Sequence, residues 1–487
     1  MPMDIRGLDL TTGSNWAAER YNTAVERYLE FRPDAADALR EALLIDPLLV
    51  MANVLLGVLF RQEENDALLP QAEHALAAAQ AGAGHAGPRE QAHVEALRLW
   101  LSRDLRGAIR AYAAILKEEP RDLLALRWLV FNAFWLGESL LMRDVPGDVL
   151  SRVNPQLPGY GFILGMQAFG LEECGEYAEA ERAGRAAVAY YRGDLWAFDA
   201  VAHVFEMECR LREGLDWLDA LAPARPGGPA GSSRRRPETP GAGRDPFGGR
   251  LGWHRALYLF ELEQWEAVLQ AYDGKIRSRG SDFWLDIQNA ASVLWRLELR
   301  GVDVGGRWSD LADASAGRVQ DLAQPFTSVH YVMALLRAGR PEIALRHIDA
   351  MRRADARSSP PAAGADTLAP IFSEVAVPVC EGLVAYAEAV YSRASERIMK
   401  AFGRLQSLGG SHAQRDVIVL TLIQCARDGG YMALARDLLA ARTRAKPGSA
   451  DAWHAYARVL ELSRDMEGAT VAQATGDAIA ARAEGVR

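Results

Sequence analysis

Small and hydrophobic residues recur along the chain at spacings typical of helices that pack in pairs. Ala108, Tyr112 and Pro120 stand four and eight residues apart. Two further segments repeat this spacing: Ala35, Leu39 and Pro47, and Ala435, Leu439 and Pro447. An alanine lets two helices approach closely, the residue four positions later lies over the same face, and the proline ends one helix and opens the next. The pattern predicts helix-turn-helix units with these landmarks on the second helix.

The same register continues between the landmarks. Ala72 lies 37 residues after Ala35 and 36 before Ala108, and Ala180 lies 72 residues after Ala108. A period near 36 is close to the tetratricopeptide unit of about 34 residues. Strand signals are nearly absent, because short β-branched runs such as 417–419 sit inside helical periodicity. We therefore expect an all-α, tetratricopeptide-like α-solenoid of about eleven helix-turn-helix pairs in a right-handed superhelix.

One segment interrupts the helical pattern. Residues 222–249 contain six Pro, seven Gly and five Arg, with Phe247 as the only large apolar side chain. Such a composition predicts a disordered insertion between an N-terminal half, 1–221, and a C-terminal half, 250–487. It is open whether this insertion is a basic docking or phosphorylation element, a tolerated loop or a local frame error. A second, smaller loop is predicted at 357–369.

Composition excludes several classes of protein. The 487 residues are 49% hydrophobic, which excludes a disordered chain, and 55 Lys and Arg against 64 Asp and Glu give a net charge of −9. This acidity argues against nucleic acid as a main partner. The N-terminus has no signal-peptide core, and we find no run of about 18 apolar residues, the longest candidates being 43–60 and 123–136. We expect a cytoplasmic protein without a membrane partner.

The four cysteines, Cys174, Cys209, Cys380 and Cys425, lie in apolar helical segments. No two of them stand two to four residues apart, which argues against a zinc knuckle or a redox pair. We expect all four to be reduced residues of the core.

Seven longer stretches are more specific than the repeat itself. They are LDLTTGS at 8–14, AFGLEE at 168–173, VAHVFEM at 201–207, GWHRALY at 252–258, LWRL at 294–297, VGGRW at 304–308 and GGSHAQRD at 409–416. With these stretches the chain resembles the tetratricopeptide repeat protein 38 family and its bacterial relatives over nearly its whole length. The resemblance implies an α-solenoid, and it implies no activity because the family has no settled biochemical function.

The chain also departs from the pattern of this family. Asp199 and Arg250 each stand where the relatives tend to have His. Asn289 replaces an Asp, and 327–328 replace an Asn-Asp pair just before His330. If the family has an enzymatic centre, the resemblance implies that this chain has lost part of it.

The candidate site residues share a predicted placement. Because the Ala and Pro landmarks mark second helices, the polar and aromatic residues of the family-like stretches fall on first helices. In tetratricopeptide solenoids the first helices line the concave surface, where ligands usually bind. The candidates for binding in this groove are His203, Glu206, Trp253, His254, Trp295, His330, Arg415 and Asp416.

Each histidine candidate has a functional and a structural interpretation. His203 and Glu206 share a helix face, so the carboxylate can orient the imidazole as a base or a ligand, or the two can form a structural pair. His254 follows Trp253 near a helix start, where an imidazole tends to stay neutral and can accept a proton or bind a ligand. In the structural interpretation, His254 caps the helix or packs in the core. His330 lies in an apolar context, which favours a buried, hydrogen-bonded side chain.

The remaining candidates are residue types that bind peptide or protein ligands. Arg415 suits a carboxylate or phosphate, but with Asp416 it can equally tie adjacent helices together. Most of the twelve tryptophans belong to the core, while one or two exposed in the groove, such as Trp253 or Trp295, would anchor a peptide.

Three functional hypotheses follow, and we assign no cofactor, no metal ligand and no catalytic residue from the sequence. The first is a scaffold that binds a protein or peptide in its concave groove. The second hypothesis, which we favour less, is an enzyme, or a protein that binds a small molecule or a metal. It uses His203, Glu206, His254 and His330. The nearest zinc set would be His203, Glu206 and His254, which spacing alone supports weakly. In the third, the polar residues only brace the superhelix. Nucleophile-elbow, phosphate-loop and His-Glu-x-x-His motifs are not found.

Overall fold

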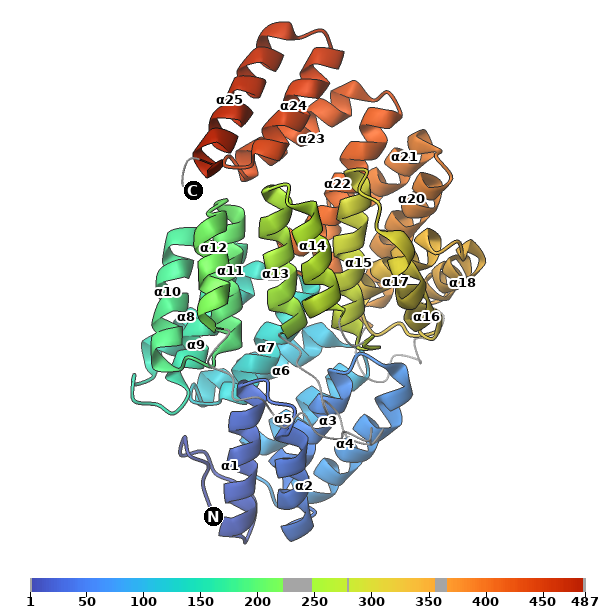
Figure 1. The fold of residues 1–487 in the computed structure, drawn as a ribbon. Helices are drawn as coiled ribbons and strands as arrows, with labels where there is room; N and C mark the ends of the chain where they lie inside the picture. Colours follow the sequence, from blue (N-terminus) through green and yellow to red (C-terminus); the bar gives the residue numbers. More distant parts are fainter. Residues whose placement is uncertain (1, 222–247, 278–279, 355–365, 485–487) are drawn as a thin grey trace.

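The computed structural model describes residues 2–221, 248–277, 280–354 and 366–484, and these residues are helical apart from turns and an isolated bridge between Met3 and Asp9. Helices pack in antiparallel pairs along the chain (Figure 1). The first helices of the pairs are α1 (Asn15–Leu29), α3 (Val50–Arg61), α5 (Pro88–Leu101), α7 (Leu123–Leu136), α9 (Tyr160–Glu173), α11 (Leu195–Met207), α13 (Gly248–Glu261), α15 (Trp284–Leu299), α17 (Pro325–Arg337), α20 (Val377–Ala387), α22 (His412–Asp428) and α24 (Ala450–Leu462).

The second helices complete the pairs. They are α2 (Ala35–Ile45), α4 (Leu69–Ala83), α6 (Leu105–Glu118), α8 (Ser139–Arg152), α10 (Tyr177–Tyr190), α12 (Leu211–Leu221), α14 (Trp265–Ala271), α16 (Trp308–Ala316), α18 (Pro341–Arg352), α21 (Tyr391–Phe402), α23 (Met432–Ala445) and α25 (Met466–Glu484). Short helical segments adjoin them: η1 (Asp66–Leu68), η3 (Tyr272–Ile276), η4 (Gly305–Arg307), α19 (Ala369–Ile371), η6 (Phe372–Ala376) and η7 (Leu405–Leu408). Of these, α19 and η6 run on into α20 as one helix, Ala369–Ala387. The described residues thus form twelve pairs, against the eleven or so expected, and the chain is an all-α helical-repeat protein.

The alanine landmarks mark the second helices, as predicted. Ala35, Ala72, Ala108, Ala180 and Ala435 lie on α2, α4, α6, α10 and α23, and all of them are buried. Several first helices begin at an aspartate whose side chain accepts a hydrogen bond from the first turn: Asp122 before α7 and Asp194 before α11. Such caps satisfy backbone N–H groups that lack a partner inside the helix.

The first helices form the interior of the molecule. Helices α7, α11, α15 and α17 are buried on nearly every side, whereas their second helices bury only one face. Distant parts of the chain close around them (Figure 1). Gln406 Nε2 donates to the carbonyl of Gly137 at 2.6 Å, and Trp284 Nε1 donates to the carbonyl of Gln62 at 3.1 Å. The inner face of the superhelix is therefore packed against other parts of the same chain.

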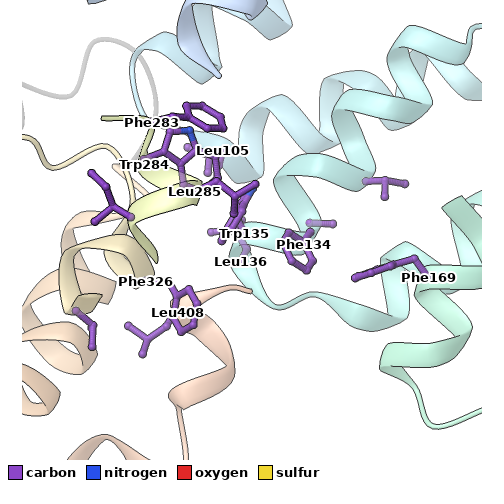
Figure 2. Close-up of a cluster of buried hydrophobic side chains, with 14 of the residues drawn as sticks. Leu105, Phe134, Trp135, Leu136, Phe169, Phe283, Trp284, Leu285, Phe326 and Leu408 are labelled. Atoms are coloured by element: carbon purple, nitrogen blue, oxygen red, sulfur yellow. The ribbon is translucent and has the colours of Figure 1, made fainter. Parts of the chain in front are cut away.

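A large apolar cluster lies where these distant segments meet. Figure 2 shows α7 contributing Phe134 and Trp135, which face residues of α9, α15 and α17. The rings of Trp135 and Trp284 are 5.1 Å apart and those of Phe134 and Phe169 are 5.5 Å apart, both edge to face. Aromatic pairs of this geometry add roughly 0.5–1.5 kcal/mol each beyond the area they bury. The cluster therefore holds the N-terminal third of the chain onto its middle.

Two glycines allow the chain to enter α22 at the centre. Gly409 and Gly410 have φ angles of 82° and 75°, and a Cβ on Gly409 would lie 2.4 Å from the carbonyl oxygen of Trp135. Ser411 then caps the helix in a capping box with Gln414. The predicted turn that opens a helix is confirmed here, and it places His412 at the first position of α22.

Some predictions concern segments at the limits of the structure. The predicted insertion 222–249 lies outside the described residues except for its last two, where α13 has already begun at Gly248. Most of the predicted loop 357–369 also lies outside, and α19 begins at Ala369. The four cysteines are free, and Cys380 and Cys425 are buried as expected, whereas Cys174 and Cys209 lie half-buried in turns and not in the core. The segment Ala369–Ala387 is long and apolar enough to cross a membrane, contrary to our sequence search, but 61% of it is buried, as in a core helix.

Candidate functional site

Six charged or imidazole side chains from four inner helices meet in the interior, and we name them the histidine cluster. They are Glu172 of α9, Asp199 and His203 of α11, Arg250 and His254 of α13, and His412 of α22. All are buried except His412, whose side chain is 25% exposed. Two of the six, His203 and His254, were candidates from the sequence.

The spacing within α11 and α13 explains four of the six residues of the cluster. Asp199 and His203 stand four residues apart, as do Arg250 and His254, so each pair shares one helix face. Arg250 Nε donates to Asp199 Oδ2 at 2.6 Å, and His254 Nε2 lies 3.1 Å from Asp199 Oδ1. The rings of His203 and His254 are 4.3 Å apart. The two helix faces thus meet through one carboxylate and two imidazoles.

His203 is a neutral imidazole in this environment. Arg250 Nη2 lies 3.2 Å from His203 Nε2, and because a guanidinium only donates, that ring nitrogen accepts. Burial, followed by the charges of His254 and Arg250, lowers the pKa of His203 well below its usual value. Burial raises the pKa of Asp199, but Arg250 and His254 outweigh it and hold that pKa below its usual value.

Glu172 and His412 join the N-terminal half to the C-terminal half. His412 Nε2 lies 2.8 Å from Glu172 Oε1, and His203 Nδ1 lies 4.0 Å from Glu172 Oε2. Burial raises the pKa of Glu172 to about 7. Burial lowers the pKa of His412, but the carboxylates of Glu172 and Glu173 outweigh it and raise that pKa to about 9. The pair is therefore a buried contact between opposite charges from helices far apart in the chain.

A second charged group lies on the same inner helices, and we name it the lysine cluster: Glu206 of α11, Glu261 of α13, and Lys446 and Ser449 from the turn between α23 and α24. Lys446 Nζ donates to Glu206 Oε1 at 2.6 Å and to Glu261 Oε1 at 3.1 Å. Ser449 Oγ donates to Glu261 Oε2 at 2.8 Å. Glu206 is thus paired with Lys446, and the zinc set of His203, Glu206 and His254 considered from the sequence does not converge.

The other sequence candidates are mostly interior residues with their own partners. Trp253 and Trp295 are each 1% exposed, with their indole N–H groups directed to Ser292 and Thr421. Arg415 approaches Glu173, and Asp416 pairs with Arg442. The pairing of Asp416 with Arg442 ties the adjacent helices α22 and α23, which fits the structural alternative, whereas Arg415 reaches α9, 242 residues earlier in the chain.

His330 stands apart from both clusters. Its Nδ1 donates to the carbonyl of Phe326 at 2.9 Å, one turn earlier in α17. Burial lowers the pKa of His330 to about 4, although the bond to Phe326 opposes this. It is a buried, neutral, hydrogen-bonded histidine, which is the structural interpretation given to it from its apolar context.

Several buried polar atoms of the histidine cluster lack a hydrogen-bond partner among the described residues. They are Oε2 of Glu172, Nδ1 of His203 and Nδ1 of His254. Four further atoms fall short of hydrogen-bond geometry but face each other as ion pairs, Nε2 of His412 with Oε1 of Glu172 at 2.8 Å and Nε2 of His254 with Oδ1 of Asp199 at 3.1 Å. Buried polar groups without partners cost roughly 1–3 kcal/mol each. The cluster is therefore able to accept a further polar group or an ion, and it offers a neutral imidazole beside a carboxylate.

Comparison with known proteins adds no family. No known protein-family profile matches the chain. Similar solved structures include the human IFIT1 dimer with m7Gppp-AAAA, 14% identical over 97% of this chain and 92% of that one, with a TM-score of 0.38. The APC/C hetero-tetramer Cut9-Hcn1 is 12% identical over 96% and 94%, with a TM-score of 0.31, and yeast Tom70 is 12% identical over 81% and 95%, with a TM-score of 0.23. Likenesses this weak carry no functional argument.

Proposed function

We propose that this protein is a helical-repeat scaffold, related to the tetratricopeptide repeat protein 38 family, whose interior binds a small polar ligand at the histidine cluster. The observation that carries the proposal is the convergence of His203, His254, Glu172 and His412 with unpartnered polar atoms. Four of the family-like stretches supply these residues: 168–173, 201–207, 252–258 and 409–416. Their meeting at one place supports both the relationship and the site.

A small ligand fits the geometry better than a peptide in the groove. A peptide binder needs a long open surface with exposed anchors, whereas Trp253, Trp295 and His254 are buried. Protein or peptide binding, our first hypothesis from the sequence, stays a prediction and requires the outer surface of the solenoid. The expectations of a cytoplasmic protein and of no nucleic-acid partner also stay predictions.

The cluster meets the first requirement of a site for proton transfer, because neutral and acidic groups lie within or near hydrogen-bond reach of each other. We propose binding and no reaction, because unpartnered buried polar atoms are the observation that carries the proposal. The purely structural hypothesis, in which the cluster only braces the superhelix, is the alternative that the experiment must separate.

Native mass spectrometry of protein purified gently from the cells that make it tests the proposal. We expect a small-molecule or metal adduct that is lost in His203→Ala and kept in His454→Ala, a histidine paired with Asp477 on the exposed C-terminal pair. Thermal melting confirms that each variant is folded. A bare chain mass, or an adduct that His203→Ala leaves in place, would support bracing instead. A co-purifying polypeptide that His203→Ala leaves in place would favour the peptide hypothesis over an interior ligand.

A further inference from the structure

Three side chains of the histidine cluster have the chemistry and the spacing of a metal site. Glu172, His203 and His412 each offer a ligand atom, and these atoms all lie within 4.8 Å of one another. Zinc binds imidazole nitrogen and carboxylate oxygen at roughly 2.0–2.2 Å, so two ligands on one ion stand roughly 3–4 Å apart. The measured separations are 2.8 Å for His412 Nε2 to Glu172 Oε1 and 4.0 Å for His203 Nδ1 to Glu172 Oε2.

The directions of these groups favour an ion over a hydrogen bond. His412 Nε2 and Glu172 Oε1 are close, yet neither atom has a partner in hydrogen-bond geometry among the described residues. Glu172 is fully buried, and His203 Nδ1 is also without a partner. A single cation between them would satisfy all of these atoms at once, whereas without one each remains desolvated.

A carboxylate stands near the second ring nitrogen of each imidazole, outside hydrogen-bond distance. A ligating histidine usually donates its other ring N–H to a carboxylate or carbonyl. His412 Nδ1 lies 3.5 Å from Glu173 Oε1, which also accepts the His412 backbone N–H at 2.9 Å. His203 Nε2 lies 3.8 Å from Asp199 Oδ2. Asp199 can therefore take the His203 Nε2–H once Nδ1 binds the ion.

Arg250 decides between two possible ligand sets. Asp199, His203 and His254 also lie within 4.8 Å of one another, but the guanidinium of Arg250 already binds Asp199 at 2.6 Å. A cation there would face a fixed positive charge. At the Glu172 side Arg250 withdraws from His203 Nε2, now 3.2 Å away, toward Asp199, and the ion takes the place of the proton between His412 and Glu172. The Glu172 side is therefore the favourable one.

We propose that Glu172, His203 and His412 bind one divalent transition-metal ion of the zinc class. This ion is the small polar ligand of the proposed function, so the proposal rests on that function. Three protein ligands leave one tetrahedral position for water or another ligand. The side chain of His412 is 25% exposed, which gives the ion a route from solvent. The remaining ligands are buried, so the ion would be largely dehydrated when bound.

Metal titration of the full chain tests this proposal. The protein is stripped with a chelator, then titrated with Zn²⁺ by calorimetry and with Co²⁺ by visible absorption. We expect one ion per chain and the absorption of four-coordinate cobalt. Glu172→Gln and His412→Gln are each expected to weaken binding by about 100-fold or more, since even outer carboxylate partners are worth 10–100-fold. His330→Gln, a buried histidine outside the cluster, is the matched control and should stay within about threefold.

The outcomes separate this proposal from the one it rests on. Absence of Zn²⁺ and Co²⁺ binding, together with an organic adduct in native mass spectrometry that needs His203, would overturn the metal and keep the interior ligand site. Loss of both would overturn both. If His254→Gln weakens Zn²⁺ binding while His412→Gln does not, the ligand set proposed here is wrong. Thermal melting of each variant shows that a lost ion is not a lost fold.

Discussion

Lys446 Nζ lies 2.6 Å from Glu206 Oε1, although 240 residues separate the two in the chain. The same ammonium also binds Glu261, so Lys446→Met takes the ammonium partner from two buried carboxylates and leaves only Arg442 as a nearby positive charge for Glu261. Breaking a buried ion pair from one side typically costs about 3–5 kcal/mol. We expect Lys446→Met to lower the free energy of unfolding by about that amount, measured by urea denaturation.

Two further variants show that the loss comes from the buried charges. Lys400→Met removes a lysine that is half exposed and pairs with Glu396, so it should change the free energy of unfolding by less than about 1 kcal/mol. Adding Glu206→Gln to Lys446→Met should recover part of the stability. A loss of equal size in both lysine variants would contradict the role given to the lysine cluster.

Trp295 and Thr421 form a second link between distant inner helices. The indole Nε1 of Trp295 donates to Thr421 Oγ1 at 2.9 Å, and Thr421 Oγ1 donates to the carbonyl of Val417. Thr421→Val keeps the shape and leaves the buried indole N–H unpaired, so we expect a loss of about 1–3 kcal/mol in urea denaturation. Thr475→Val removes the same kind of bond on exposed α25 and should cost less than about 0.5 kcal/mol.

Gly170 lets α9 approach the backbone of α8. Pro146 has no N–H to offer the carbonyl of Met142, and a Cβ on Gly170 would lie 2.2 Å from that carbonyl oxygen. Gly170→Ala must therefore separate the two helices, and we expect a loss of about 3 kcal/mol in chemical denaturation. Gly84→Ala, where a Cβ meets nothing within 4 Å and φ is −61°, should be neutral within about 0.5 kcal/mol. If Gly170→Ala and Gly84→Ala were equally stable, the close approach of α9 to the backbone of α8 would be contradicted.

Asp321 should make stability depend on pH. Burial, then the charge of Asp66, raises the pKa of Asp321 to about 7, despite Arg318 at 2.6 Å. The folded state keeps this proton after the unfolded chain has lost it near pH 4, so wild-type stability falls between about pH 4 and pH 7.

Asp321→Asn removes that dependence. We expect the variant to be about 1–3 kcal/mol more stable than the wild type at pH 8, and the gain to vanish near pH 4, in urea denaturation at both pH values. Asp313→Asn, at an exposed aspartate, should show the same small effect at both. A gain of Asp321→Asn that does not change with pH would show that ionisation is not its cause.

The repeat architecture was predictable because it depends on local spacing. Ala35, Ala72 and Ala108 repeat at the period of the helix pairs, and their small side chains are what the packing of each pair requires. The closure of the superhelix was not predictable in this way. Contacts such as Gln406 with Gly137 join residues hundreds of positions apart, and no period in the sequence marks them.

The site was predictable only in part, for a reason visible on α11. His203 was paired with Glu206 from their spacing of three, but the structure uses Asp199, four residues before it. Asp199 and Glu206 are about 10 Å apart along the helix, so they serve two different clusters. His412 and Glu172 lie in family-like stretches, a signal that was present and not used. Lys446 carried no signal beyond its place before a landmark proline.

The packed inner face changes how the molecule should unfold. In an open solenoid each repeat contacts only its neighbours, so repeats can be lost or added from an end with a nearly constant loss or gain of stability. Here α22 and the turn at Lys446 contact helices more than a hundred residues earlier. Removing the C-terminal repeats would expose Glu172, Glu206 and the apolar centre to water, so this chain should melt as one cooperative unit and fold slowly for a helical protein.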